Sequence, residues 1–296
     1  MKPAQFDYHR AATLEHASEM LSTFGEDAKI LAGGQSLIAA MNYRLARPKI
    51  LVDISNVETP NVVGEEATGI RIAATTTQRY AEKHPALRQR LPVLAEAIAH
   101  IAHFQIRNKG TVGGSIVNAD PASELPALSL LLDAEFEIKS QAGLSTVAAE
   151  DFFITYMTTV LQPDEILASV LFREPPARSG WGFHEVARRA GDFAIAGSTA
   201  VVGLDDAGRC DYARVVLFGV AATPVRARAV EDALVGQDWS AQLAAEVAQE
   251  VGDVVDAESD VHVTAAYRRS AAEVLTARAL SDAFARARTV AGTLPQ

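Results

Sequence analysis

The stretch KILAGGQSL, residues 29–37, runs from a strand-like apolar segment into two glycines and then into a segment with helical character. The sequence on either side alternates in the same way. Gln5–Tyr8 has the pattern of a short strand, and Thr13 is placed to cap the helix that follows it. Ser36 is placed to cap a second helix, and Ile50–Ile54 has the pattern of a third strand. Strands that alternate with helices predict a small parallel sheet.

The glycine pair Gly33-Gly34 is a candidate phosphate-binding turn. Backbone N–H groups at a strand-to-helix turn can bind an anion, which the positive end of the helix dipole also favours. Glycine lets a phosphate approach the backbone without interference from a Cβ atom. An ordinary tight turn has the same signature, so this stretch alone leaves both interpretations open. The fingerprint G-x-G-x-x-G is absent, which argues against an ordinary Rossmann domain.

A second glycine-rich stretch, IRNKGTVGGSIVNADPASELP, covers residues 106–126 between apolar segments. The candidate phosphate donors in it are Thr111, Ser115 and the amides of Gly113 and Gly114. Polar residues suited to sugar hydroxyls follow at Asn118, Asp120, Ser123 and Glu124. A carboxylate suits a hydroxyl because it only accepts hydrogen bonds. The alternative is a long loop punctuated by glycine and Asx residues.

A third stretch, RRAGDFAIA at residues 188–196, combines two arginines, a Gly-Asp turn and an aromatic side chain. Phe193 is a candidate neighbour of an aromatic cofactor ring. The alternative is a strand–turn–strand connection with Phe193 in the core.

The remaining chain divides at the paired prolines of residues 173–180, a pattern typical of a connection. Before it, the expected elements are strands at Ile70–Ala74, Glu135–Lys139 and Asp164–Phe172, one helix over Ala86–Ile101, and a buried apolar run at Leu125–Leu132. After it, we expect strands at Trp181–Ala187, Ser198–Leu204 and Tyr212–Val220, then alanine-rich helices at Ala227–Leu234, Ser240–Val251 and Ala265–Ala287. Asp205–Gly208 predicts a hairpin turn between the last two strands.

Composition excludes several functions. The 27 Lys and Arg residues against 37 Asp and Glu give a net charge of −10 without a cationic block, so we expect no nucleic-acid partner. No apolar run approaches the roughly 20 residues that span a bilayer, and the N-terminus lacks a signal-peptide core. We therefore expect a cytoplasmic protein without a membrane span. The single cysteine, Cys210, is expected to be a small buried residue, because an iron–sulfur cluster needs several thiolates.

Other catalytic patterns are weak or absent. His100 and His103 have a spacing that a metal can use, but no third ligand is evident, and a partly exposed helix face is the favoured interpretation. The motifs G-x-S-x-G, H-E-x-x-H and Walker A do not occur. We therefore assign neither a catalytic acid–base residue nor a metal ligand.

Together, AGGQS at 32–36, TVGGSIVNADPASELP at 111–126 and RRAGDFAIA at 188–196 resemble the FAD-binding medium subunit of the molybdenum hydroxylases. That family includes the flavoprotein subunit of carbon monoxide dehydrogenase and the FAD domain of xanthine dehydrogenase. The resemblance covers essentially the whole chain. Carbon monoxide dehydrogenases often carry tyrosine where Phe193 stands, so the ring environment here differs.

The resemblance implies a fold and a set of site residues. The fold would be α+β: a two-subdomain FAD-binding fold of the vanillyl-alcohol oxidase and p-cresol methylhydroxylase type, followed by a C-terminal antiparallel sheet with a helical bundle. The implied limits are 1–55, 56–177 and 178–296. The residues implied to hold non-covalent FAD are Ala32, Gly33, Gly34, Gln35, Ser36, Leu37, Ile106, Thr111, Gly113, Gly114, Ser115, Asn118, Ala119, Glu124, Asp192 and Phe193.

The implied function is electron transfer within a larger complex. A large partner subunit would hold the molybdenum cofactor, and a small one would relay electrons through two [2Fe-2S] clusters to FAD. FAD would pass them to NAD+, a quinone or oxygen. The implied assembly is a dimer of heterotrimers, a heterohexamer. Two alternatives stay open: a stand-alone flavin-dependent oxidoreductase, and a non-enzymatic nucleotide-binding assembly factor.

Overall fold

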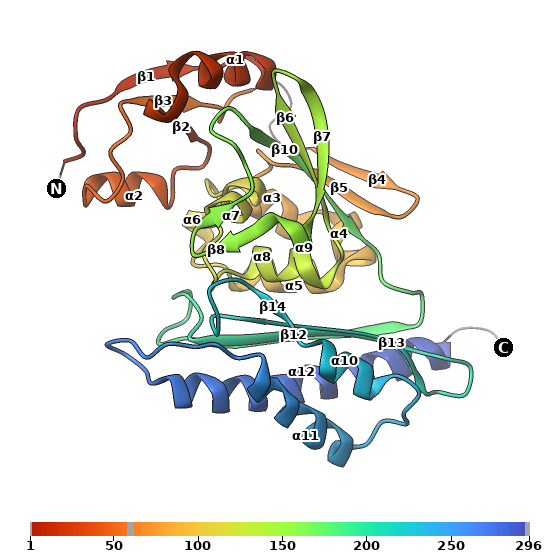
Figure 1. Cartoon of the computed structure of the whole chain (residues 1–296). Helices are drawn as coiled ribbons and strands as arrows, with labels where there is room; N and C mark the ends of the chain where they lie inside the picture. Colours follow the sequence, from red (N-terminus) through yellow and green to blue (C-terminus); the bar gives the residue numbers. More distant parts are fainter. Residues whose placement is uncertain (1, 58–61, 294–296) are drawn as a thin grey trace.

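The computed structural model describes residues 2–57 and 62–293. Figure 1 shows three successive units along the chain, each built on a sheet of its own. Helices cover these sheets, and strands and helices are both well represented, which confirms the α+β class. The limits at residues 55 and 177 stay a prediction.

The N-terminal unit is the parallel sheet that the sequence predicts. Its strands are β1 (Asp7–Arg10), β2 (Ala28–Leu31) and β3 (Ile50–Asp53), in the order β1-β3-β2. Both strand pairs are parallel. Helix α1 (Leu14–Phe24) begins at Thr13, whose hydroxyl accepts a hydrogen bond from the His16 amide at 3.1 Å. A short helix α2 (Leu37–Asn42) follows the glycine turn.

The middle unit is a five-stranded antiparallel sheet with helices on one side (Figure 1). Its strands, in sheet order, are β4 (Val63–Glu66), β5 (Gly69–Ala73), β10 (Ile166–Arg173), β6 (Glu135–Ser140) and β7 (Gly143–Ala148). The helices are α3 (Gln78–Lys83), α4 (Pro85–Arg90), α5 (Pro92–His100), α6 (Phe104–Arg107), α7 (Val112–Asn118), α8 (Glu124–Leu131) and α9 (Ala149–Phe152). A small hairpin joins β8 (Phe153–Thr155) to β9 (Thr158–Thr159).

One expectation and one alternative for this unit need correction. The helix predicted over Ala86–Ile101 is two helices, α4 and α5, because Pro92 cannot donate the backbone hydrogen bond that would continue the first. Residues 106–126 do not form one long loop, because α7 and the start of α8 lie within them. The apolar run at Leu125–Leu132 is buried as predicted, as part of α8 and its C-terminal end.

The C-terminal unit is an antiparallel sheet in the order β11 (Ser179–Val186), β12 (Ala196–Leu204), β13 (Cys210–Phe218) and β14 (Val225–Arg226). The helices α10 (Arg228–Leu234), α11 (Ala241–Gln249) and α12 (Ala265–Thr293) cover its outer face in Figure 1. Helix α12 lies so close to β11 that a Cβ atom on Gly180 or Gly182 would overlap the α12 backbone. Helices α5 and α8 of the middle unit contact the sheet as well. The sheet is therefore enclosed between two helical layers.

Cys210 lies in the core of the C-terminal unit, as expected for a small apolar residue. Burial raises the pKa of its thiol to about 11, so the thiolate that metals and redox chemistry require is suppressed. Within residues 2–57 and 62–293, no helix is both long and apolar enough to cross a membrane.

Candidate functional site

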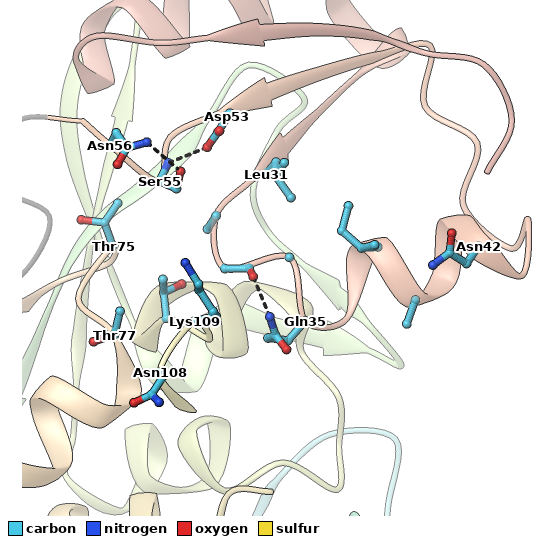
Figure 2. Close-up of a pocket in the computed structure, with 16 residues that line it drawn as sticks. Leu31, Gln35, Asn42, Asp53, Ser55, Asn56, Thr75, Thr77, Asn108 and Lys109 are labelled. Atoms are coloured by element: carbon cyan, nitrogen blue, oxygen red, sulfur yellow. Dashed lines mark hydrogen bonds between the residues drawn. The ribbon is translucent and has the colours of Figure 1, made fainter. Parts of the chain in front are cut away.

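A cavity of about 700 Å³ lies where the N-terminal unit meets the start of α7 (Figure 2). Both glycine-rich stretches reach it. Of the predicted site residues, Ala32, Gly33, Gly34, Gln35 and Thr111 line it. Its size falls within the range of pockets that hold small molecules and cofactors, roughly 300–1,000 Å³.

The first glycine pair is required by close packing and by backbone conformation. A Cβ atom on Gly33 would overlap the Lys109 carbonyl oxygen and would lie 2.8 Å from the Gly110 Cα atom. Gly34 has φ = +72°, a left-handed conformation that glycine adopts readily. The first turn therefore lies directly against the segment that precedes α7, and the two stretches face each other.

The backbone amides of the first turn are available to a ligand. Among the described residues, none accepts a hydrogen bond from the amides of Gly33, Gly34, Gln35 or Ser36. The Gln35 side chain donates to the Gly33 carbonyl at 3.0 Å and so braces the turn (Figure 2). Ser36 stands at the start of α2 as predicted, but its hydroxyl makes no capping hydrogen bond there. Consecutive free amides of this kind form an anion-binding concavity.

The second glycine pair contributes differently from what the sequence suggested. The Gly113 amide donates to the Ala74 carbonyl at 2.9 Å, and the Gly114 amide donates to the Thr111 hydroxyl oxygen at 3.0 Å. These two amides are therefore not free donors. Gly113 is needed because a Cβ atom there would lie 2.7 Å from the Ala74 Cα atom. Of the predicted donors in this stretch, Thr111 alone lines the cavity, and it can offer its hydroxyl proton.

Sequence reasoning missed the charged residue of the cavity, Lys109. It is the only cation among the described residues that line the space, and no described carboxylate lies within ion-pair distance of it. Figure 2 shows its side chain between the first turn and Thr77. The turn that carries it is fixed, because the Lys109 amide donates to the Ile106 carbonyl at 3.0 Å and the Gln78 amide donates to the Gly110 carbonyl at 2.8 Å.

Sequence reasoning also missed a polar rim at the ends of strands. Its residues are Asp53 at the end of β3, Ser55 and Asn56 after it, Thr75 and Thr77 after β5, and Asn108 before α7. Ligands in open α/β sheets bind beyond the carboxyl ends of parallel strands, so the end of β3 was the signal that could have found the first group. The residues after β5 give no such signal, because that strand lies in an antiparallel sheet.

Asp53 is the only carboxylate of this rim within the described chain. It is buried, accepts a short hydrogen bond from the Tyr8 hydroxyl, and accepts another from the Ser55 amide at 2.7 Å. Burial alone raises the pKa of Asp53, but these hydrogen bonds outweigh it and hold the pKa below its ordinary value. Asp53 therefore stays ionised, engaged with the N-terminal unit.

Most of the other predicted residues do not line this cavity. They are Ser36 and Leu37 at the start of α2, Ile106 in α6, Gly113, Gly114, Ser115 and Asn118 in α7, Ala119 after it, and Glu124 at the start of α8. Glu124 is the exceptional member. Burial, followed by the nearby Glu185 carboxylate, raises the pKa of Glu124 to about 8, so it is neutral at pH 7. His100 is a neighbour of Glu124, and its Nδ1 atom lies 3.4 Å from Oε1 of Glu185. The Glu185 carboxylate raises the pKa of the His100 imidazole.

Asp192 and Phe193 lie apart from the cavity, on a turn beside the middle unit. Phe193 is 58% exposed, so the core alternative for it is wrong. The turn begins at Gly191 (φ = +85°), where a Cβ atom would lie 3.1 Å from the Ala102 carbonyl carbon and the His103 ring. A second cavity of about 430 Å³ lies here, lined in part by His100, Glu185 and Arg189. In the described part of the chain, no cluster of three or more His, Cys, Asp or Glu side chains could hold a metal ion.

Comparison with known families accounts for the whole arrangement. The family described as "FAD binding domain in molybdopterin dehydrogenase" matches residues 4–173. The family described as "CO dehydrogenase flavoprotein C-terminal domain" matches residues 181–283. The first match alone spans more than half of the chain, and it contains both glycine-rich stretches.

Relatives match over nearly their full length. The chain is 38% identical to 6-hydroxypseudooxynicotine dehydrogenase complex subunit alpha of Paenarthrobacter nicotinovorans, covering 97% of each chain. It is 36% identical to the carbon monoxide dehydrogenase medium chain of Afipia carboxidovorans, covering 97% of this chain and 100% of that one. A solved structure of carbon monoxide dehydrogenase from Hydrogenophaga pseudoflava superimposes with a TM-score of 0.94 at 34% identity, covering 97% and 99%. The resemblance drawn from the sequence is confirmed: this chain belongs to the family of FAD-binding medium subunits of the molybdenum-containing dehydrogenases.

Proposed function

We propose that this chain is the flavin relay of a heteromeric molybdenum hydroxylase. It receives electrons from [2Fe-2S] clusters of a small partner subunit and passes them from FAD to an external acceptor. A large partner subunit holds the molybdenum cofactor and oxidises the substrate. The names of the relatives support this organisation, since they are called subunits or medium chains of dehydrogenases.

The observation that carries the proposal is the meeting of the two glycine-rich stretches around one cavity. Residues 33–35, whose amides are free, line it from one side, and Lys109 and Thr111 line it from the other. Amides and an ammonium group are the donors that a diphosphate requires. Among the described residues, the cavity offers one cation, Lys109, and one carboxylate, Asp53, which is engaged by Tyr8 and Ser55. This lining suits a cofactor that is held rather than attacked.

The chain's own residues hold and orient the cofactor. The first turn and Thr111 donate hydrogen bonds to the diphosphate, and Lys109 offsets part of its charge. Ser55, Asn56 and Asn108 offer polar groups to the remainder of the dinucleotide. Ser115, Asn118, Ala119 and Glu124 would hold the flavin chain, and Asp192 and Phe193 would neighbour the ring. When bound, FAD supplies the one- and two-electron chemistry, and the protein supplies position and electrostatics.

Glu124 has a defined chemical role in this scheme. Because burial keeps it protonated at pH 7, its carboxyl group both donates and accepts a hydrogen bond. A ribityl hydroxyl also does both, so the two groups are matched without placing a buried charge beside the flavin. We further propose a dimer of heterotrimers in the cytoplasm, with the limits 1–55, 56–177 and 178–296 as working units.

The test is anaerobic stopped-flow reduction of the purified chain. We expect the isolated chain to carry FAD and to turn over no organic substrate. Addition of the iron–sulfur subunit, reduced beforehand and freed of reductant, should bleach the flavin absorbance. Substrate turnover by the chain alone would support a stand-alone oxidoreductase instead. A colourless chain that releases no flavin in acid would support an assembly factor.

A further inference from the structure

Three titratable side chains come together where the middle unit contacts the C-terminal sheet. His100 belongs to α5, Glu124 to α8 and Glu185 to β11. Figure 1 shows α5 and α8 on the side of the middle unit that faces the C-terminal sheet, and α5 contacts both α8 and β11. The carboxyl groups of Glu185 and Glu124 both raise the pKa of the His100 imidazole, so the three groups lie close enough to exchange charge effects.

Glu185 has one carboxylate oxygen that is paired and one that is not. Its Oε1 atom lies 3.4 Å from Nδ1 of His100. Its side chain is only 10% exposed, and no described residue donates a hydrogen bond to its buried Oε2 atom. A buried acceptor without a donor is costly, because folding removes its hydration and supplies nothing in exchange. Oε2 is therefore ready to accept the proton of a neighbouring acid, and Glu124 is a buried acid that is protonated at pH 7.

The opposite end of this cluster reaches solvent through the second cavity. His100 and Glu185 both line that space of about 430 Å³, and 47% of the His100 side chain is exposed. Glu96, on the same helix, also raises the pKa of His100, and the cavity is further lined by His103 and Arg189. An imidazole at the surface that gains and loses a proton near neutral pH is suited to proton transfer.

The proposed electron transfer has a requirement that the electron donor does not meet. Iron–sulfur clusters deliver electrons and bring no protons with them. Two-electron reduction of FAD takes up at least one proton and gives FADH⁻, and reoxidation releases that proton again. Glu124 is the buried acid among the predicted flavin-binding residues, and at pH 7 it has a proton to give. A buried acid serves repeated turnovers only if it is reprotonated from solvent.

We infer that His100 and Glu185 form a proton path between the second cavity and Glu124, an inference that rests on the proposed function. On reduction, the O–H bond of Glu124 breaks, and its proton passes by the ribityl hydroxyl to a ring nitrogen, where an N–H bond forms. The Glu124 carboxylate that remains takes a proton from His100 by way of Glu185, and His100 takes one from solvent. Reoxidation runs the same steps in reverse.

The test uses the full chain loaded with FAD and measures two rates. Glu124 gives an infrared carboxyl band that Glu124→Gln lacks, and its decay after a jump to alkaline pH reports how fast the proton leaves. Proton uptake on reduction is followed with a pH-indicator dye, and the reductant is the methyl viologen radical, which supplies electrons without protons. The variants are His100→Ala and Glu185→Gln. The matched control is His184→Gln, because His184 also lies on β11 but pairs with Asp282, at 2.9 Å.

We expect both rates to fall at least about tenfold in His100→Ala and in Glu185→Gln, and to stay unchanged in His184→Gln. Added imidazole should restore both rates in His100→Ala, because it carries protons through the space that the side chain leaves, and should restore neither in Glu185→Gln. Unchanged rates in the two variants, or a loss in His100→Ala that imidazole does not restore, would overturn the inference and leave the proposed function intact.

A chain that carries FAD but is not reduced by the iron–sulfur subunit would count against the proposed function itself. The infrared rate requires no reduction, so it still tests the proton path in that case. The two proposals therefore fail separately.

Discussion

Replacement of Lys109 by Gln is the sharpest test of the diphosphate site. Gln keeps much of the side-chain length and its hydrogen bonding, but it removes the only cation that lines the cavity within the described chain. Two unit charges about 4 Å apart interact by about 1 kcal/mol in water and about 4 kcal/mol at an effective dielectric constant near 20. Because Lys109 is exposed at the rim, we expect the lower part of that range, about 1–2 kcal/mol, or roughly 5- to 30-fold weaker binding of FAD.

The assay is titration of FAD into the deflavinated chain, followed by flavin fluorescence at low and at high salt. The loss for Lys109→Gln should shrink in high salt, because ions screen a surface charge pair. Affinity for riboflavin, which has no phosphate, should be unchanged. Lys83→Gln, on α3 and outside the cavity, is the matched control. Equal FAD affinity and equal salt dependence in Lys109→Gln and the unmodified chain would refute the reasoning.

Three further predictions concern stability and site geometry. Gly33→Ala should lower flavin occupancy and lower the free energy of unfolding by about 1–3 kcal/mol, because its Cβ atom would overlap the Lys109 carbonyl. The control Gly292→Ala, in open space on α12, should have little effect in thermal unfolding. For Glu124 the folded-state pKa is about 8, above the ordinary 4.5, so the folded chain loses stability as pH rises through that window. Glu124→Gln should remove this loss, raising the melting temperature by a few degrees above pH 8 and leaving it unchanged near pH 5; parallel pH profiles of both proteins would contradict the assignment. Arg107→Met should lower the free energy of unfolding in urea by about 2–3 kcal/mol, because the carbonyls of Ile101 and Ala102 lose two hydrogen bonds and Glu82 loses one of its two arginine partners; a loss below about 1 kcal/mol would contradict that role.

The sequence predicted those features that local chemistry determines. Thr13 caps α1, Ile50–Ile54 gives the central parallel strand, and Asp205–Gly208 gives the hairpin, because each depends on neighbouring residues alone. The first glycine turn was found for the same reason. The break at Pro92 was missed because the apolar periodicity continues through it, although proline removes the hydrogen bond that would make one helix.

The parts of the site that depend on tertiary packing could not be predicted. Lys109 faces the cavity only because Gly33 packs against its carbonyl, a contact between residues 76 positions apart in the chain. The Gly113 amide is taken by the Ala74 carbonyl, which no local pattern announces. The Gly114 amide is taken by Thr111, the N-cap of α7, which the local sequence could have indicated. Phe193 lies at the surface, on a turn that packs against the Ala102 backbone and the His103 ring of another unit.

The central claim is tested most directly by isolating the tagged chain from its own host and measuring flavin, iron and molybdenum in the same preparation. We expect non-covalent FAD in proportion to the chain, together with iron and molybdenum carried by two co-purifying chains. A preparation that lacks FAD, or one that carries FAD and turns over a substrate with neither iron nor molybdenum present, would contradict it.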